Sequence, residues 1–212
     1  MLLYLLRHGE TDWNVERRIQ GVSDIPLNEV GLSQAEAIVK LLAERTVHAI
    51  YSSPFRRSRQ TAEMLASAFG LPILDEPRLA ELDQGELEGK TMEELEEQHN
   101  DFMVSWRTRP AKLRMPGGET LVELQERAWA ALDDFRVKHL GETVAAVSHN
   151  LTITALLCRI LGMDLDRFRV IRQHNATLNI LEYDPERGWS VVTMNSLSHL
   201  RNAPAAGRNP YV

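Results

Sequence analysis

The feature that most constrains the fold is a short apolar segment at the start of the chain. The run from Leu2 to Leu6 is entirely apolar and stops abruptly at Arg7-His8-Gly9. Such a run is typical of a strand that is buried on both faces of a parallel sheet. The polar residues then lie at the carboxyl end of the strand, where open α/β sheets bind ligands, and Gly9 permits a sharp turn. We therefore expect an arginine and a histidine side by side at the rim of a sheet.

Predicted strands and helices alternate along the rest of the chain. Further strands are predicted at Val47–Tyr51, Pro72–Leu74 and Thr143–Val147, followed by a pair joined by a turn, Thr177–Tyr183 and Trp189–Met194. Helices are predicted from about Ser33, over Arg56–Phe69, after Thr91, over Asp101–Arg107, from Leu121 and over about Leu151–Leu161. Gly70 is expected to end the second of these, and Thr91 and Glu94 to form a capping box at the start of the third. For the last helix, Asn150 is a better N-cap candidate than His149. The segment Asp12–Leu27 is interpreted as a loop. This alternation indicates an α/β fold with a mostly parallel, doubly wound sheet.

Composition excludes several classes of protein. The formal net charge of −6 argues against a general binder of nucleic acid or anionic membranes, so any positive site must be local. The single cysteine, Cys158, excludes an intrachain disulfide and lies in an apolar stretch typical of a buried thiol. The first apolar run is too short for a signal peptide or a membrane span. We expect a soluble cytoplasmic protein with a single domain over residues 1–201 and a loose tail over residues 202–212.

Three of the predicted strands end in polar pairs: Arg7-His8, Ser52-Ser53 and Ser148-His149. Because the carboxyl ends of parallel strands meet at one edge of a sheet, His8 and His149 are expected in the same site. The histidines show neither an i,i+4 pair nor a cysteine partner, so zinc-binding spacing is absent, and Gly117-Gly118 lacks the lysine of a phosphate-binding loop. We therefore expect no metal and no cofactor.

A set of short motifs follows in order along the chain. The set comprises Arg7-His8-Gly9-Glu10-Thr11, Asn14, Gln20-Gly21, Ser52-Ser53-Pro54-Phe55-Arg56-Arg57, Gln60-Thr61-Ala62, Leu79-Ala80-Glu81-Leu82 and Val147-Ser148-His149. In this combination the sequence resembles the histidine phosphatase superfamily, also called the phosphoglycerate mutase-like family. In length it is similar to the compact bacterial phosphatases of that family. The resemblance covers most of the chain and implies a three-layer αβα fold.

The resemblance also implies a role for each matching residue. His8 would be the nucleophile and form a phosphohistidine, which requires a ring nitrogen that carries no proton. Arg7 and Arg57 would clamp the phosphoryl oxygens with paired, permanently charged donors, and His149 would be a third donor. Glu81 would protonate the leaving oxygen and later activate water. The remaining candidates for substrate binding are Asn14, Gln20, Gly21 and Asn150.

Simpler interpretations stay open beside these roles. Without the resemblance, Arg57 would be part of a solvated helix face with Arg56 and Arg59, and Glu81 would be one of several neighbouring acidic residues. Two positions depart from the common pattern of the family: Leu87 stands where many relatives have Trp, and Asn150 stands where many have Gly. The histidines outside the motifs are interpreted as structural or exposed: His48, His99, His139, His174 and His199.

The segment of residues 82–118 is expected to cap the site and to select the substrate. The family's mutases usually carry a longer insertion here, so the short segment favours a phosphatase. Four of its cations are candidates for binding a second anionic group of the substrate, although each is equally well a solvated loop residue: Arg107, Arg109, Lys112 and Arg114.

The sequence therefore favours a metal-independent phosphatase that hydrolyses small phosphomonoesters through a phosphohistidine. A 2,3-bisphosphoglycerate-dependent phosphoglycerate mutase is the alternative, and a non-catalytic binder of phosphorylated ligands is a third hypothesis. A binder has no need of a general acid, so Glu81 argues against it. The expected partner is a small phosphorylated metabolite, with no nucleic acid and no membrane. A homodimer is compatible with the resemblance, because relatives are often dimers.

Overall fold

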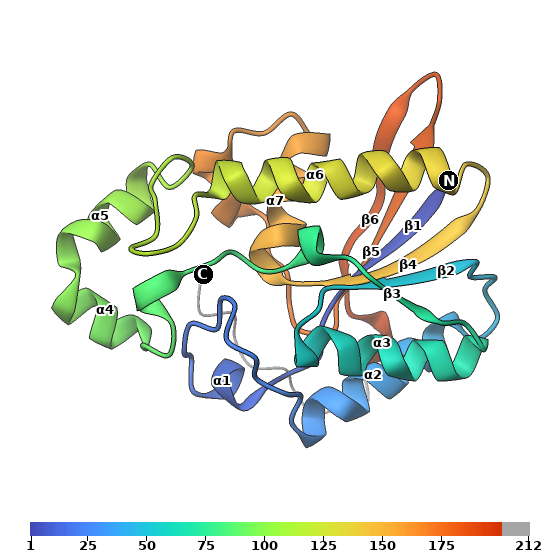
Figure 1. Ribbon diagram of the computed structural model, residues 1–212, viewed down its shortest axis with the longest axis horizontal. Helices are drawn as coiled ribbons and strands as arrows, with labels where there is room; N and C mark the ends of the chain where they lie inside the picture. The colour runs from blue at the N-terminus through green and yellow to red at the C-terminus, as the bar shows by residue number, and fades with distance from the viewer. Residues whose placement is uncertain (201–212) are drawn as a thin grey trace.

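A six-stranded sheet forms the centre of the computed structural model, which describes residues 1–200 (Figure 1). Its strands are β1 (Leu2–Arg7), β2 (Ala49–Ser52), β3 (Ile73–Asp75), β4 (Thr143–Ser148), β5 (Leu178–Asp184) and β6 (Gly188–Ser196). They lie in the order β3-β2-β4-β1-β5-β6. The pairs β2–β3, β2–β4 and β1–β4 are parallel, whereas β1–β5 and β5–β6 are antiparallel. The predicted mostly parallel sheet and the predicted pair of strands at the end are thus confirmed.

The first strand is buried on both faces of the sheet, as its apolar run predicts. Leu3 and Leu5 belong to the hydrophobic cluster on one face, and Tyr4 and Leu6 belong to the cluster on the other. Successive side chains of a strand point to opposite faces, so a strand between two clusters needs apolar residues at every position. This burial leaves Arg7 and His8 as the first polar groups at the carboxyl end of β1.

Helices cover both faces of the sheet. The helices are α1 (Asp12–Val15), α2 (Glu29–Leu42), α3 (Arg56–Phe69), α4 (Met92–Gln98), α5 (Asn100–Thr108), α6 (Leu121–Lys138) and α7 (Asn150–Ile160). Short 3₁₀ turns are η1 (Pro77–Leu79), η2 (Gly85–Leu87), η3 (Leu165–Val170) and η4 (Ser198–Leu200). The pair α2 and α3 lies on one side of the sheet and the pair α6 and α7 on the other (Figure 1). The three-layer αβα architecture is therefore confirmed.

Local signals in the sequence fix several helix ends correctly. Helix α3 has the predicted bounds, and it ends at Gly70, whose φ of 64° is the left-handed conformation that glycine adopts most readily. Helix α4 begins with the predicted capping box, in which the Thr91 hydroxyl accepts from the Glu94 amide and the Glu94 carboxylate accepts from the Thr91 amide.

Three local predictions are wrong. The segment interpreted as a loop begins with α1, because Thr11 and Asn14 form a capping box that closes one helical turn. Helix α2 begins earlier than Ser33, because the Asn28 side chain accepts from the amide of Gly31 and caps the helix there. Asn150 is not the N-cap of α7: His149 takes that position with extended backbone, and Asn150 is the first helical residue.

The segment of residues 82–118 contains η2, α4 and α5, which lie together at one end of the molecule (Figure 1). Its apolar side chains, Leu87, Leu95 and Met103 among them, belong to the same cluster as the buried faces of α6 and α7. Cys158 is buried as predicted, and burial raises the pKa of its thiol to about 11. Within residues 1–200 no helix is long and apolar enough to cross a membrane. The predicted tail, and residue 201 at the end of the predicted domain, lie outside the described residues.

Candidate active site

His8 follows β1 directly and is held as a neutral ring. Its Nδ1 lies 2.6 Å from the carbonyl oxygen of Gly9, and because a carbonyl only accepts, Nδ1 carries the proton. Nε2 therefore keeps its lone pair, and it makes no hydrogen bond to any residue between 1 and 200. Burial lowers the pKa of His8 well below 6.5, and the positive charges of Arg57 and Arg7 lower it further. The geometry thus gives His8 an unprotonated nitrogen that can attack an electrophile.

Two buried guanidinium groups surround this ring. Arg7, the last residue of β1, is 2% exposed, and its Nη1 donates to the carbonyl of Gln173 at 2.6 Å. Arg57, in the first turn of α3, is 1% exposed. Its Nη1 and Nη2 donate to the carbonyls of Ser23 and Gly21, both at 2.6 Å. These contacts hold two permanent positive charges beside a neutral imidazole, so an acidic chain contains a strong local anion site.

His149 lies against Arg57 at the amino end of α7. Its Nδ1 accepts from Arg57 Nε at 3.2 Å, so its proton is on Nε2, which lies 2.7 Å from Ser53 Oγ and 3.2 Å from Ser58 Oγ. The ring centroids of His149 and His8 are 5.2 Å apart. Burial lowers the pKa of His149 well below 6.5, and Arg57 and His8 add to this effect. The structure thus brings the two histidines together, while direct donation from His149 to a phosphoryl group stays a prediction.

Glu81 is held against the first turn of α7. Its Oε2 accepts from the amide of Leu151 at 3.1 Å, and its Oε1 accepts from the amides of Thr152 and Leu82 at 3.2 and 2.9 Å. A helix amino terminus offers unpaired N–H groups, and these amides fix the position of both oxygens of the carboxyl group. The side chain is 5% exposed, so Glu81 reaches the site as a carboxyl group in a defined orientation.

A small cavity joins these groups, with about 270 Å³ of empty space when its opening to solvent is included. Its lining includes every residue that the sequence predicts for the site except His149, and it adds Arg18: Arg7, His8, Asn14, Arg18, Gln20, Gly21, Arg57, Glu81 and Asn150. These residues come from the end of β1, from α1 and the loop after it, from the starts of α3 and α7, and from the segment before η2. The predicted convergence of strand ends thus produces one concave site.

Asn14 is oriented by two neighbours. Its Oδ1 accepts from the Thr11 amide and hydroxyl, both at 3.1 Å, and from Asn175 Nδ2 at 2.9 Å. The amide nitrogen of Asn14 is therefore the end presented to the cavity, as a neutral donor. Asn175 also donates to the Gly9 carbonyl at 3.3 Å, the same oxygen that accepts from His8. Asn175 is not among the residues predicted from the sequence, and nothing in the residues around it indicates this contact.

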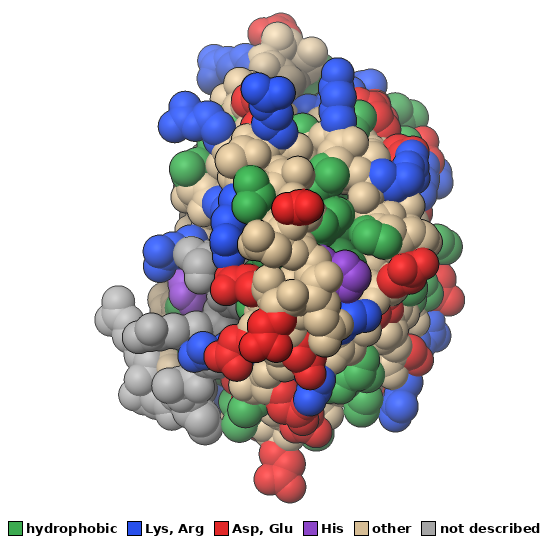
Figure 2. All heavy atoms as spheres, turned by 90° about the vertical axis from the view of Figure 1, so that its left-hand side faces the viewer, with side chains coloured by type: hydrophobic (Ala, Val, Ile, Leu, Met, Phe, Trp, Pro, Cys, Tyr) green, Lys and Arg blue, Asp and Glu red, His purple; other side chains and the backbone are tan. Residues whose placement is uncertain are grey.

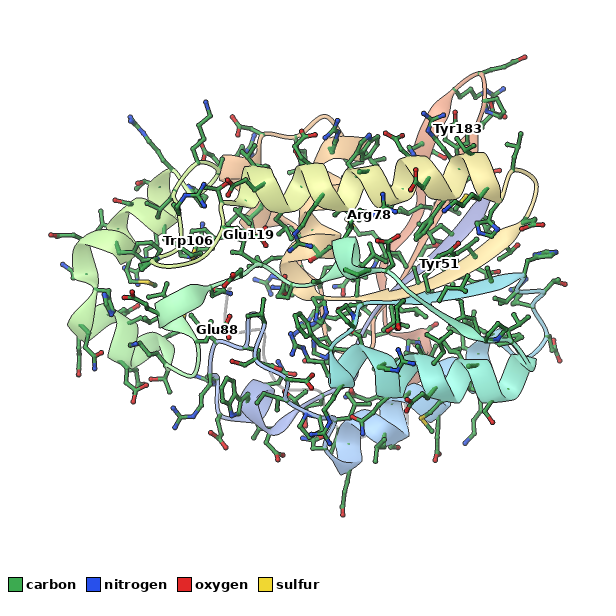
Figure 3. The ribbon with its side chains drawn as sticks, in the orientation of Figure 1. Tyr51, Arg78, Glu88, Trp106, Glu119 and Tyr183 are labelled. Carbon is green, nitrogen blue, oxygen red and sulfur yellow. The ribbon has the colours of Figure 1, made fainter. Side chains whose placement is uncertain are left out.

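A loop between α1 and α2 supplies Gln20 and Gly21. Gln20 lines the cavity, and its Oε1 is buried without a hydrogen-bond partner in the described part of the chain. Glu88, which directly follows η2, binds this loop (Figure 3). Its Oε1 accepts from the amide of Val22 at 2.8 Å, and its Oε2 accepts from the amide of Ser23 at 2.9 Å. The φ of Gly21 is 49°, which favours glycine, and a Cβ there would lie 2.0 Å from Glu88 Oε1 and force that side chain to move. The segment of residues 82–118 is thus tied to the loop whose carbonyls hold Arg57.

Comparison with known proteins identifies the family. The model of the histidine phosphatase superfamily (branch 1) matches residues 3–197. The chain belongs to the histidine phosphatase superfamily. A probable phosphoglycerate mutase GpmB of Escherichia fergusonii is 38% identical over 207 residues, which is 96% of each chain. YhfR of Bacillus stearothermophilus has a similar structure with a TM-score of 0.88 at 33% identity, covering 94% of this chain and 98% of that one.

A mycobacterial glucosyl-3-phosphoglycerate phosphatase, solved in complex with VO₃, is also similar to the chain. It has a TM-score of 0.83 at 27% identity, and the match covers 92% of this chain and 99% of that one. Membership of the superfamily and similarity to phosphatase structures confirm the predicted family and the predicted phosphatase class of enzyme.

In this histidine phosphatase, the four cations of the segment 82–118 that are candidates for binding a second anionic group do not line the cavity. All four are exposed: Arg107, Arg109, Lys112 and Arg114. Arg107 pairs with Glu96, and Arg114 pairs with Glu123 at 2.5 Å. Figure 2 views this end of the molecule and shows Lys and Arg side chains extending from its upper surface into solvent. The cation that the structure brings to the cavity is instead Arg18, for which the sequence analysis predicts no role.

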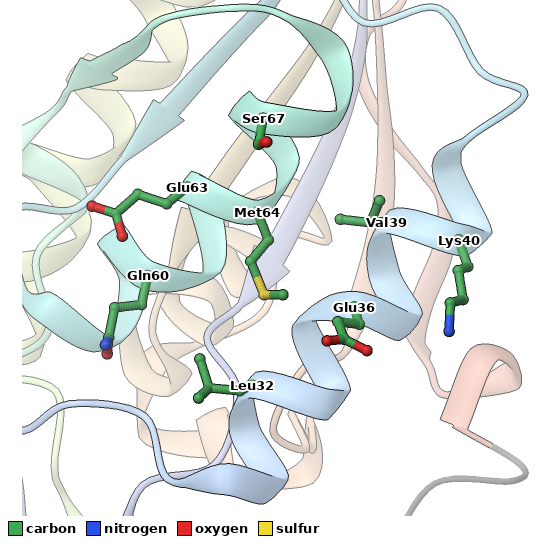
Figure 4. Close-up of a pocket in the computed structure, with 8 residues that line it drawn as sticks. All are labelled: Leu32, Glu36, Val39, Lys40, Gln60, Glu63, Met64 and Ser67. Atoms are coloured by element: carbon green, nitrogen blue, oxygen red, sulfur yellow. The ribbon is translucent and has the colours of Figure 1, made fainter.

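A larger open hollow lies between α2 and α3, away from the His8 cavity (Figure 4). It contains about 890 Å³ of empty space, and its walls include Glu36, Glu63, Lys40 and Met64. Two carboxylates and a single amine make it unsuited to a phosphate dianion, and no imidazole is among the described residues that line it to act as nucleophile or base. The smaller cavity is therefore the candidate active site of the superfamily member.

Proposed function

We propose that this chain is a metal-independent phosphatase that hydrolyses small phosphomonoesters through a phosphohistidine on His8. The observation that supports this most directly is the neutral His8, with its unprotonated Nε2 between two buried arginines in a cavity that also contains Glu81. Phosphoryl transfer depends mainly on positioning and on stabilising the charge of the phosphoryl oxygens. Arg7 and Arg57 supply that charge in a site of low exposure, where it is poorly screened.

In the first step, His8 Nε2 attacks phosphorus and forms an N–P bond while the bond from phosphorus to the ester oxygen breaks. Glu81 gives its proton to the departing oxygen, so the alcohol leaves neutral. Arg7 and Arg57 neutralise the phosphoryl oxygens, and the amide nitrogen of Asn14 donates to one of them. In this arrangement His149 acts through Arg57, because its Nδ1 accepts a hydrogen bond from Arg57 Nε.

In the second step, water attacks the phosphohistidine. Glu81, now a carboxylate, takes a proton from the water as the O–P bond forms and the N–P bond breaks. Inorganic phosphate leaves, and His8 returns to its neutral form with the proton still on Nδ1, where the Gly9 carbonyl holds it. The same residues thus serve both halves of the reaction.

A phosphoglycerate mutase is the second candidate, because a relative 38% identical over 207 residues is named a probable phosphoglycerate mutase. Its chemistry would share the first step and return the phosphoryl group to a hydroxyl of a glycerate instead of water. The relative that is a glucosyl-3-phosphoglycerate phosphatase supports hydrolysis of a small phosphorylated metabolite.

The deciding experiment uses the full chain with 3-phosphoglycerate and a trace of 2,3-bisphosphoglycerate, followed by ³¹P NMR. A phosphatase releases inorganic phosphate, and we expect the same rate when EDTA is present. Accumulation of 2-phosphoglycerate without free phosphate would establish the mutase instead. A rate that disappears with EDTA and returns with added divalent metal would contradict the metal-independent mechanism.

Glu81→Gln tests the general acid by its dependence on the leaving group. For an alkyl ester, kcat/KM is expected to fall roughly 10²- to 10³-fold, because the departing alkoxide needs a proton. For p-nitrophenyl phosphate the fall in kcat/KM should stay below about 10-fold, because nitrophenolate leaves without one. Glu97→Gln, an exposed carboxylate on α4, is the matched control. Equal losses with both esters would show that Glu81 has a different role.

A further inference from the structure

Arg18 lines the cavity with Arg7 and Arg57, but its position differs from theirs. Arg7 and Arg57 are 2% and 1% exposed and donate to main-chain carbonyls, whereas the Arg18 side chain is 35% exposed. We propose that Arg18 binds a carboxylate of the substrate while the phosphoryl group lies at His8. This inference rests on the proposed function and names the chemical class of its substrate: a phosphomonoester that carries a carboxylate a few bonds from the phosphate.

Contacts on both sides hold the Arg18 guanidinium in place. Its Nε donates to Glu16 Oε2 at 2.6 Å, and its Nη1 donates to the carbonyl of Gly89 at 2.7 Å. The backbone of Arg18 also forms an antiparallel bridge with Thr91, so the loop after α1 is joined to the start of α4. Its Nη2 makes no hydrogen bond with residues 1–200. One donor of a positioned guanidinium is therefore available to a ligand.

The size of the cavity brings a second group of the substrate near Arg18. The cavity is small, and the buried arginines and His8 take its inner part. The remainder of an ester bound at His8 must extend toward solvent, where the more exposed Arg18 lies. Short phosphorylated metabolites carry their second polar group only a few bonds from the phosphate. Such a group would meet Arg18 before it reached any of the exposed cations of α5 and the loop after it.

The charges around Arg18 favour a carboxylate over a second phosphate. Glu16 lies 2.6 Å from its Nε, and Glu94 lies 3.8 Å from its Nη1, so two negative charges already stand there. A phosphate dianion would be repelled by both carboxylates, whereas a single negative charge can replace Glu16 on the guanidinium. Glu16 is half exposed, and exposed ion pairs contribute little, so this exchange costs little. The planar guanidinium also matches the two oxygens of a carboxylate.

The test compares two esters that differ only in this group, 3-phosphoglycerate and glycerol 3-phosphate, which have a carboxylate and a hydroxymethyl group at the same carbon. The wild type is expected to prefer 3-phosphoglycerate. Arg18→Gln should lower kcat/KM for 3-phosphoglycerate by roughly 10- to 100-fold, which is the range for losing one charge-assisted hydrogen bond. For glycerol 3-phosphate, kcat/KM should change by less than about 3-fold, because this ester has no carboxylate to lose. Glu16→Gln should raise kcat/KM for 3-phosphoglycerate alone, because it removes the competing carboxylate.

Arg107→Gln is the matched control, since it removes one exposed, paired arginine from the same end of the molecule. It should leave kcat/KM unchanged for both esters. Suppose that the wild type releases phosphate from both esters, but Arg18→Gln lowers kcat/KM for both equally or for neither. The proposal that Arg18 binds a carboxylate is then wrong, and the proposed function stands. If the wild type releases phosphate from neither ester nor from any other phosphomonoester, the proposed function fails, and the site fails with it.

Discussion

Replacing His8 with alanine is expected to lower kcat/KM for phosphomonoesters by on the order of 10⁴-fold or more, the loss typical of removing a nucleophile. No second imidazole lines the cavity among residues 1–200 to take over: the other side chains there are amides, guanidinium groups and the Glu81 carboxyl group, which serves as the acid. The arginines would remain and still bind phosphate, so the variant should retain affinity for inorganic phosphate while it loses turnover. A loss of turnover with binding intact separates the nucleophile from a merely structural histidine.

The covalent intermediate gives a second measurement of the same prediction. Wild-type protein quenched during turnover of a ³²P-labelled ester should carry label on His8 that is stable to base and lost in acid, the behaviour of a phosphoramidate. His8→Ala should carry none, and His99→Gln, a histidine between α4 and α5 that does not line the cavity, should label like the wild type. Label that persists in His8→Ala would place the intermediate elsewhere and contradict the mechanism.

The parts of the site that the sequence predicts are those set by local pattern and strand topology. Arg7, His8 and His149 follow buried strands, and the ends of parallel strands must meet at one edge, so their proximity follows from the pattern alone. Arg57 follows from the family motif, and its burial beside the exposed Arg56 distinguishes it from the solvated face on which a simpler interpretation places it.

The parts that the sequence does not predict depend on tertiary contacts. Asn175 comes from the loop before β5, more than 160 positions after Asn14, and only the antiparallel pairing of β5 with β1 brings the two together. Arg18 reaches the cavity because its loop pairs with residues 89–91. No periodicity or motif encodes either contact. The loop prediction for residues 12–27 fails for a local reason, since a capping box between Thr11 and Asn14 closes a turn too short to show an apolar periodicity.

Replacing Arg57 should produce the second-largest loss, with kcat/KM for Arg57→Gln reduced by about 10³-fold, as for other residues that stabilise a transferring phosphoryl group. Its guanidinium lies at the centre of the site and contacts the carbonyls of Gly21 and Ser23 as well as His149. Glutamine cannot satisfy these three acceptors from one amide. Arg56→Gln, the adjacent and exposed arginine of α3, should retain wild-type activity and controls for the change in net charge.

The pH dependence distinguishes the charge of Arg57 from its geometry. Burial is the main cause of the low pKa of His8, and Arg57 is the next. The reaction needs neutral His8, so activity falls as pH drops through this pKa. The wild type should therefore show no acid limb from His8 near pH 6.5, because the pKa lies well below that value. Removing the charge in Arg57→Gln lets the pKa of His8 rise, so the acid limb of kcat/KM moves to higher pH.

Arg57→Lys keeps the positive charge but loses the planar fork, so it should lose rate while its acid limb stays near that of the wild type. A profile of kcat/KM from about pH 4.5 to 8 for the three proteins separates the two contributions. If both variants lose rate equally and neither limb moves, Arg57 does not set the pKa of His8. Its effect would then be to hold the loop of Gly21 and Ser23, and the neutral state of the nucleophile would depend on burial and on Arg7.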